Sequence, residues 1–165
     1  MRRTVFKSKI HRATVTDGNL NYEGSLSIDQ DLLDAADILP NEQIHVWDVT
    51  NGVRLITYAL PAKRGSKEVC VNGAGAHLIK KGDLVIVATF TEMKTKEAKK
   101  YKPTVVFVDE TNVIKEVADE PAPTTTTPME PSEATEPPTS HAPTPAPTED
   151  AEPTVKASTK RPRRR

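Results

Sequence analysis

The sequence contains a single cysteine, Cys70, and four histidines that do not have the spacing of metal ligands. One cysteine excludes an intramolecular disulfide and a cysteine-based structural zinc site, and it fits a reducing compartment. No apolar run approaches the length of a membrane span, and the basic N-terminus lacks the apolar segment of a secretion signal. We therefore expect a cytoplasmic protein with no metal site and no membrane contact, in which Cys70 is a buried structural thiol.

Glycine and aromatic residues are missing from the last part of the chain. All seven glycines and all seven aromatic residues precede residue 119, whereas eleven of the fourteen prolines and ten threonines follow residue 118. A segment of this composition cannot bury enough apolar surface to offset its ordering entropy. We therefore predict one folded domain over residues 1–118 and a disordered Pro/Thr/Glu-rich tail over residues 119–165. The six basic residues at the end of the tail indicate either a dispensable extension or a segment that binds an anionic partner.

The predicted domain also lacks an excess of either charge, with 17 Lys and Arg residues against 15 Asp and Glu residues. It has few aromatic side chains on which nucleic-acid bases could stack. We therefore expect no binding of nucleic acid by the domain.

Short alternating segments predict a mainly β domain. Strands are expected over residues 4–16, 43–48, 53–60, 67–71, 84–90 and 104–108. Many short strands with one or two short helices are typical of a small β-barrel.

Turns and helix signals separate the predicted strands. Asp17-Gly18-Asn19 indicates a turn, and Asn51-Gly52 indicates a type I′ hairpin in which both central residues have positive φ. Ser27 and Gln30 match a capping box, which predicts a helix with Ser27 as its N-cap that ends at Pro40. A second short helix is expected over residues 95–100.

The dipeptide Gly24-Ser25 carries the most informative chemistry. A glycine carbonyl is not shielded by a side chain, so the following serine hydroxyl can attack it and convert the amide into an ester. The dipeptide alone is common in turns, but here further motifs stand at fixed distances from it. These motifs are Lys9-Ile10-His11-Arg12, Thr50-Asn51-Gly52, Arg54, Thr57-Tyr58-Ala59 and Val71-Asn72-Gly73-Ala74. Over residues 1–117 the constellation resembles the aspartate 1-decarboxylase family, pyruvoyl-dependent enzymes that make β-alanine.

The resemblance implies a double-psi β-barrel and a zymogen that cleaves itself between Gly24 and Ser25. Ser25 would become a covalently bound pyruvoyl group through ester formation, β-elimination and hydrolysis with loss of ammonia. That group would form a Schiff base with L-aspartate, so that pyridoxal phosphate is not needed, and would accept the electrons released with CO2. The product implies a place in pantothenate, and hence coenzyme A, biosynthesis.

The resemblance also assigns roles to individual residues. Tyr58 would be the proton donor, since an unperturbed phenol is protonated at neutral pH. Arg54, Lys9 and His11 would bind the substrate, and the planar guanidinium of Arg54 suits a carboxylate. Thr57 would serve both self-cleavage and substrate binding.

The small-residue loop after the strand at residues 67–71 completes the implied site. Asn72 would orient the scissile bond, and Gly73, Ala74 and Gly75 would contact the substrate through backbone groups. The family pattern commonly has alanine at position 75 and histidine at position 21, where this chain has Gly75 and Asn21. Glycine at position 75 is expected to loosen the loop.

Strand alternation places Arg54 and Tyr58 on one face of their strand and Thr57 on the other. Either a bulge in the strand or a contribution from a neighbouring subunit would reconcile this with a single site. Family members are tetramers with sites at subunit interfaces, which favours the second explanation and predicts a homotetramer.

Two other functions are compatible with a small β-barrel of this kind. One is an uncleaved, non-catalytic barrel that binds a small acid or a protein partner, and the other is a small adaptor or nucleic-acid binder. Neither accounts for the matched residues as well. Whether cleavage is spontaneous or needs a maturation helper stays open.

Overall fold

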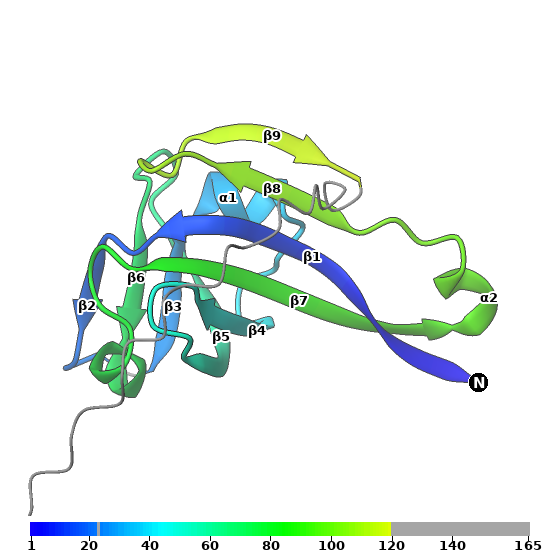
Figure 1. Cartoon of the computed structure of the whole chain (residues 1–165), viewed down its shortest axis with the longest axis horizontal. Coiled ribbons are helices and arrows are strands. Elements are labelled where there is room, and N and C mark those ends of the chain that lie inside the picture. Colours follow the sequence, from blue (N-terminus) through cyan, green and yellow to red (C-terminus); the bar gives the residue numbers. More distant parts are fainter. Residues whose placement is uncertain (23, 120–165) are drawn as a thin grey trace, which may run out of the picture. The chain divides into compact units, whose positions relative to one another are not determined.

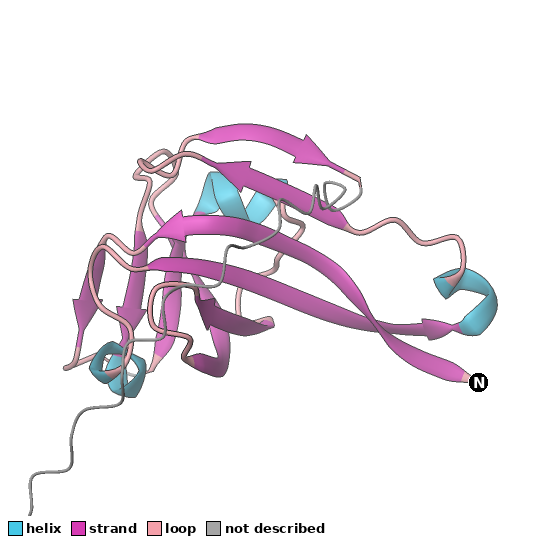
Figure 2. Cartoon of the chain, in the orientation of Figure 1, coloured by secondary structure: helices cyan, strands magenta, loops and turns pink. Residues whose placement is uncertain are grey.

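The computed structural model describes residues 1–22 and 24–119, and strands make up most of this part (Figures 1 and 2). The strands are β1 (Arg2–Thr14), β2 (Asp17–Asn19), β3 (Ser25–Asp29), β4 (Gln43–Asp48), β5 (Arg54–Ala62), β6 (Val69–Asn72), β7 (Leu84–Lys94), β8 (Thr104–Val108) and β9 (Ile114–Ala118). The helices are α1 (Gln30–Ala35), the 3-10 helix η1 (Gly73–His77) and α2 (Thr95–Ala98). Of the predicted tail over residues 119–165, all but residue 119 lies outside the described residues. No helix in the described ranges is long and apolar enough to cross a membrane.

The strands form one sheet in the order β2-β6-β3-β5-β4-β7-β1-β8-β9. Three pairings join distant strands in parallel, namely β1 with β8, β2 with β6 and β3 with β5, and the others are antiparallel. Figure 1 shows β3 and β6 running across the direction of the long strands β1 and β7. The sheet surrounds one apolar core, whose largest buried side chains include Ile10, Leu26, Ile28, Leu32, Leu33, Ile44 and Ile79. The mainly β class with short helices is confirmed, and the arrangement is consistent with a small β-barrel.

The start of α1 differs from the prediction. Ser27 lies inside β3, and the N-cap is Asp29, whose carboxylate accepts a hydrogen bond from the backbone N–H of Asp31 at 2.9 Å. β3 is hydrogen-bonded to β5 on one side and to β6 on the other, and these pairings outweigh the local capping pattern. The helix also ends earlier, at Ala35, and leaves Leu39 largely exposed.

Two turn predictions are corrected. Asp17–Asn19 is not a turn but the short strand β2, because it pairs in parallel with Cys70–Asn72 of β6. A hairpin does join β4 to β5, but only Gly52 of its two predicted central residues has a positive φ, +80°. The carboxylate of Asp48 accepts hydrogen bonds from the backbone N–H groups that follow it and fixes a different turn. Strand β9 was not predicted.

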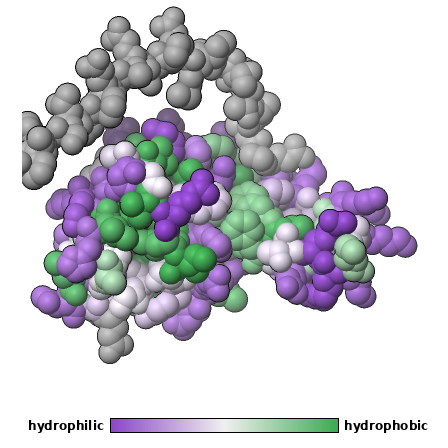
Figure 3. Space-filling view, turned by 60° about the horizontal axis from the view of Figure 1, so that its bottom comes forward, coloured by the Kyte–Doolittle hydropathy of each residue, from purple (hydrophilic) through white to green (hydrophobic). Residues whose placement is uncertain are grey.

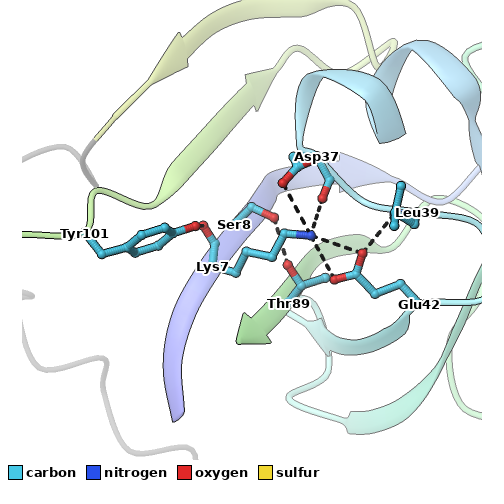
Figure 4. Close-up of polar contacts among 7 residues, drawn as sticks. All are labelled: Lys7, Ser8, Asp37, Leu39, Glu42, Thr89 and Tyr101. Atoms are coloured by element: carbon cyan, nitrogen blue, oxygen red, sulfur yellow. Dashed lines mark hydrogen bonds and ion pairs between the residues drawn. The ribbon is translucent and has the colours of Figure 1, made fainter. Parts of the chain in front are cut away.

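An ion pair ties β1 to the loop that precedes β4 (Figure 4). The register of β1 against β7 shifts between Phe6 and Ser8, at Lys7. The Nζ atom of Lys7 lies 3.0 Å from Oε1 of Glu42 and also donates to the backbone carbonyl of Asp37. The side chains of Lys7 and Glu42 are 15% and 21% exposed, so the pair is shielded from solvent. It therefore holds the path of the chain into β4.

We expect Lys7→Ala to lower the free energy of unfolding by about 2–3 kcal/mol, because it leaves the shielded Glu42 carboxylate without its cation. Arg2→Ala is the matched control, since it breaks an ion pair with Glu92 in which both side chains are 63% exposed. Such a pair contributes little to stability. Urea unfolding of both variants measures the difference, and equal stabilities would contradict the role given to Lys7.

Candidate active site

The Ser25 side chain is held at the start of β3 by a residue of β6. Ser25 is 3% exposed and lies opposite Asn72 in the antiparallel pairing of the two strands. The side-chain amide of Asn72, which is 4% exposed as a residue, donates a hydrogen bond to Oγ of Ser25 over 3.0 Å. The hydroxyl that was predicted to attack the Gly24 carbonyl is therefore buried and oriented.

The Asn72 amide has two further partners. It donates to Oγ of Ser27 over 2.9 Å, and its Oδ1 accepts from the thiol of Cys70 over 3.6 Å. Burial, and after it the negative charges of Glu68 and Asp17, raise the pKa of the Cys70 thiol. The thiol therefore keeps its proton at neutral pH and acts as the donor. Cys70 is buried, as predicted.

Gly73, the first residue of η1, packs directly against the residue that precedes Ser25. Gly73 has φ +60°, and a Cβ atom added there would lie 2.7 Å from Cα of Gly24 and 2.9 Å from the carbonyl oxygen of Tyr22. Both its backbone conformation and the space around it therefore require glycine.

A cavity of about 270 Å³ opens beside Ser25. It is lined by Gly24, Ser25, Leu26, Val46, Leu55, Ile56, Thr57, Val71, Asn72, Ala74, Gly75 and Leu78. Six of the residues predicted for the site thus share one cavity. Gly73 does not line it but packs against Gly24, which does. Ile56 and Leu78 are 61% and 53% exposed, so part of its apolar wall faces outward.

Arg54 and Tyr58 lie on the opposite face of β5 from Thr57. The pairing of β5 with β4 runs in regular steps from Arg54 opposite Trp47 to Tyr58 opposite Gln43. The bulge considered from the sequence is therefore wrong, and alternation along β5 is regular. The guanidinium of Arg54 lies 5.1 Å from the ring centroid of Trp47, and Tyr58 is 37% exposed.

Lys9 and His11 share a face of β1, as predicted, and lie apart from the cavity. They pair with Val105 and Phe107 of β8, and the His11 ring packs edge-on against Phe107 with the ring centroids 5.4 Å apart. Burial, followed by the positive charges of Lys9 and Arg12, lowers the pKa of His11, so its imidazole is neutral at pH 7. Burial also lowers the pKa of Lys9.

Sequence reasoning missed the part that Ser27 and Cys70 play around Asn72. Ser27 had been assigned to a helix cap, and Cys70 to the core alone. Alternation along β3 could have placed Ser27 beside Ser25, but the partner strand and its register could not be read from the chain. No group of three or more His, Cys, Asp and Glu residues that could hold a metal occurs within residues 1–22 and 24–119.

Comparison with known proteins confirms the resemblance seen in the motifs. A family model described as aspartate decarboxylase matches residues 1–115. The chain is 62% identical over 112 residues to a protein of Myxococcus xanthus (strain DK1622) named aspartate 1-decarboxylase, covering 68% of this chain and 86% of that protein. Proteins of the same name from Caulobacter vibrioides (strain ATCC 19089 / CIP 103742 / CB 15) and Syntrophus aciditrophicus (strain SB) are 58% and 56% identical over 115 residues. Each comparison covers 70% of this chain, and 98% and 99% of those proteins respectively.

We expect Gly73→Ala to destabilise the domain by about 1–3 kcal/mol more than Gly65→Ala does, because an added methyl at position 73 meets backbone atoms. Gly65 is the matched control, since it also has a positive φ, +75°, but has no other atom within 4 Å of an added Cβ. Both variants carry the cost of the backbone conformation, and only one carries the steric clash. Equal losses in urea unfolding would show that the contact with Gly24 is not tight.

Proposed function

The chain belongs to the aspartate decarboxylase family, and on that premise we propose that it cleaves itself between Gly24 and Ser25 and then converts L-aspartate to β-alanine and CO2. The observation that carries the proposal is the buried Ser25 hydroxyl, which accepts a hydrogen bond from Asn72 and directly follows an unshielded glycine carbonyl. A cavity large enough for a small amino acid adjoins it.

The residues present fit a pyruvoyl group derived from Ser25. The position is enclosed, and the absence of a side chain on Gly73 leaves room for the chain at Gly24. The pyruvoyl ketone supplies the electron sink that decarboxylation of an α-amino acid requires. We infer no metal and no pyridoxal phosphate in this reaction.

Self-cleavage begins at the Ser25 hydroxyl in this proposal. Its Oγ bonds to the carbonyl carbon of Gly24, the C–N bond between the two residues breaks, and the hydroxyl proton passes to the freed amine. Elimination then releases residues 1–24 with a C-terminal carboxylate and leaves dehydroalanine at position 25. Addition of water and loss of ammonia complete the pyruvoyl group. Asn72 orients Oγ, and we assign Thr57, which lines the same cavity, to this step and to substrate contact.

Substrate binding and protonation require residues that one chain does not bring to its own cavity. Arg54 would hold a carboxylate of the substrate, with Lys9 and His11 beside it, and Tyr58 would return a proton to Cα. The backbone of Gly73, Ala74 and Gly75 would contact the substrate from the cavity side.

A homotetramer with sites at its interfaces accounts for this separation. Thr57 lines the cavity, whereas Tyr58, its neighbour on a regular strand, does not, and this fits a site to which two chains contribute. The outward apolar wall of the cavity, Ile56 and Leu78, supports a covering subunit, and Figure 3 shows apolar surface gathered on the face of the domain in view. We place the reaction in the cytoplasm and in pantothenate biosynthesis, and a maturation helper is compatible with it.

We expect the purified protein to give two masses under denaturing conditions. One is residues 1–24, and the other is a chain from position 25 that is lighter by one ammonia than a serine-headed chain. Ser25→Ala should give one full-length mass, a folded protein and no aspartate decarboxylation, whereas Ser66→Ala, at an exposed serine, should cleave normally. A single full-length mass for the unaltered protein, even with cell extract added, would favour the uncleaved, non-catalytic barrel.

Tyr58→Phe should cleave normally but lose activity, because it removes the proton donor and keeps the ring. We expect kcat per cleaved chain to fall by roughly 10²–10⁴-fold with little change in KM. Tyr101→Phe is the control, since Tyr101 is 38% exposed and its hydroxyl donates to the backbone of Lys7. Unchanged kcat in cleaved Tyr58→Phe would exclude Tyr58 as the donor.

A further inference from the structure

Four polar side chains meet between β3 and β6. In the antiparallel pairing Ser25 lies opposite Asn72, and Ser27 lies opposite Cys70. Directly opposed residues, and residues two apart on one strand, project to the same face of a sheet. Ser25, Ser27, Cys70 and Asn72 therefore form one cluster on that face, and three hydrogen bonds connect them through the Asn72 amide.

We propose that Ser27 and Cys70 are positioning residues for self-cleavage, which fix the Asn72 amide in the orientation that donates to Oγ of Ser25. This inference rests on the proposed function, since it concerns the step that matures Ser25. Neither residue lines the cavity beside Ser25, and both are hydrogen-bonded to Asn72.

Counting donors and acceptors shows why one amide orientation is selected. The amide of Asn72 has two N–H donors and one carbonyl oxygen. In the observed orientation the two donors reach the hydroxyl oxygens of Ser25 and Ser27, and the oxygen accepts from the Cys70 thiol. A reversed amide would place its NH2 group beside the Cys70 sulfur, a weak acceptor that only one of the two N–H groups could reach, and would leave the other N–H unsatisfied in a buried position. Removing either partner weakens this preference.

The orientation matters for the chemistry of Ser25. Negative charge develops on Oγ as it gives up its proton for the attack on the Gly24 carbonyl, and it passes to the carbonyl oxygen as the new bond forms. An N–H donor of Asn72 stabilises Oγ while it carries that charge. A reversed amide would present its carbonyl oxygen to Oγ and oppose the developing charge. After cleavage Oγ has left position 25 with the carboxylate of residues 1–24. The contribution of Ser27 and Cys70 should therefore appear in maturation and not in turnover of aspartate.

Conservative and disruptive variants separate this role from simple packing. Ser27→Ala and Cys70→Ala remove a hydrogen-bond partner of Asn72. Ser27→Thr keeps the hydroxyl that accepts from Asn72, and Cys70→Ser replaces the thiol with a hydroxyl that can still donate to Asn72. The Cys70 pair also tests whether a donor, and not sulfur itself, is needed.

The experiment follows the appearance of residues 1–24 by intact mass in freshly purified full-length protein, with melting temperature and decarboxylation per cleaved chain as parallel readouts. We expect Ser27→Ala and Cys70→Ala to cleave about 10–100-fold more slowly, Ser27→Thr and Cys70→Ser to cleave within a few-fold of the unaltered protein, and all cleaved chains to decarboxylate aspartate at the same rate.

Cleavage of both alanine variants at the unaltered rate would overturn the inference, and so would slowing that follows the loss of melting temperature equally in alanine and conservative variants. If the unaltered protein does not cleave at all, the proposed function fails first and the inference fails with it. That result differs from the others because it appears without any substitution.

Discussion

The contact between Asn72 and Ser25 depends on the pairing of β3 with β6, and the candidate site depends on that contact. β3 is short, and it holds its place because it bonds to β5 on one side and to β6 on the other. At its end the fully buried carboxylate of Asp29 accepts hydrogen bonds from the backbone N–H groups of Gly65 and Lys67 over 3.0 and 2.6 Å. The connection from β5 to β6 is thereby fixed next to β3. A reactive serine needs this rigidity because its hydroxyl must reach one carbonyl and no other.

The regularity of β5 imposes the second constraint. Thr57 lines the cavity and Tyr58 does not, and the two side chains lie on opposite faces of the strand. A bulge would have brought both to one side at the cost of the pairing with β4. The intact pairing leaves the tyrosine available to a different cavity. Under the proposed function, the groups assigned to self-cleavage lie in one chain, whereas the groups assigned to catalysis on aspartate would come together with those of a second copy.

The sequence predicted those features that depend on local pattern. The pattern of apolar, β-branched and polar residues identified most strands, including β4 and β8 with their observed bounds. The prediction was wrong at Ser27, which matches a helix cap by its local sequence but lies within β3, because that strand is paired on both edges. The sequence predicts a turn at β2 because three residues are too few to show the alternation of apolar and polar residues that marks a strand. Motifs identified Gly24, Ser25 and Asn72. The contact of Ser27 and Cys70 with Asn72 depends on the register of β3 against β6, which no local pattern encodes.

The surroundings of Gly75 give a packing reason for the departure from alanine at this position. Glycine was expected to loosen the loop, but Gly75 lies in η1 and its place is set by neighbours. An added Cβ would stand 3.0 Å from Cγ1 of Val71, which is tighter than ordinary van der Waals contact, and 3.4 Å from Cδ2 of Leu55, which is at its lower limit. Both neighbours also line the cavity. An alanine at this position would therefore require the cavity wall to shift by a few tenths of an ångström. Glycine at position 75 thus leaves the space that the side chains of Val71 and Leu55 occupy in the wall of the cavity.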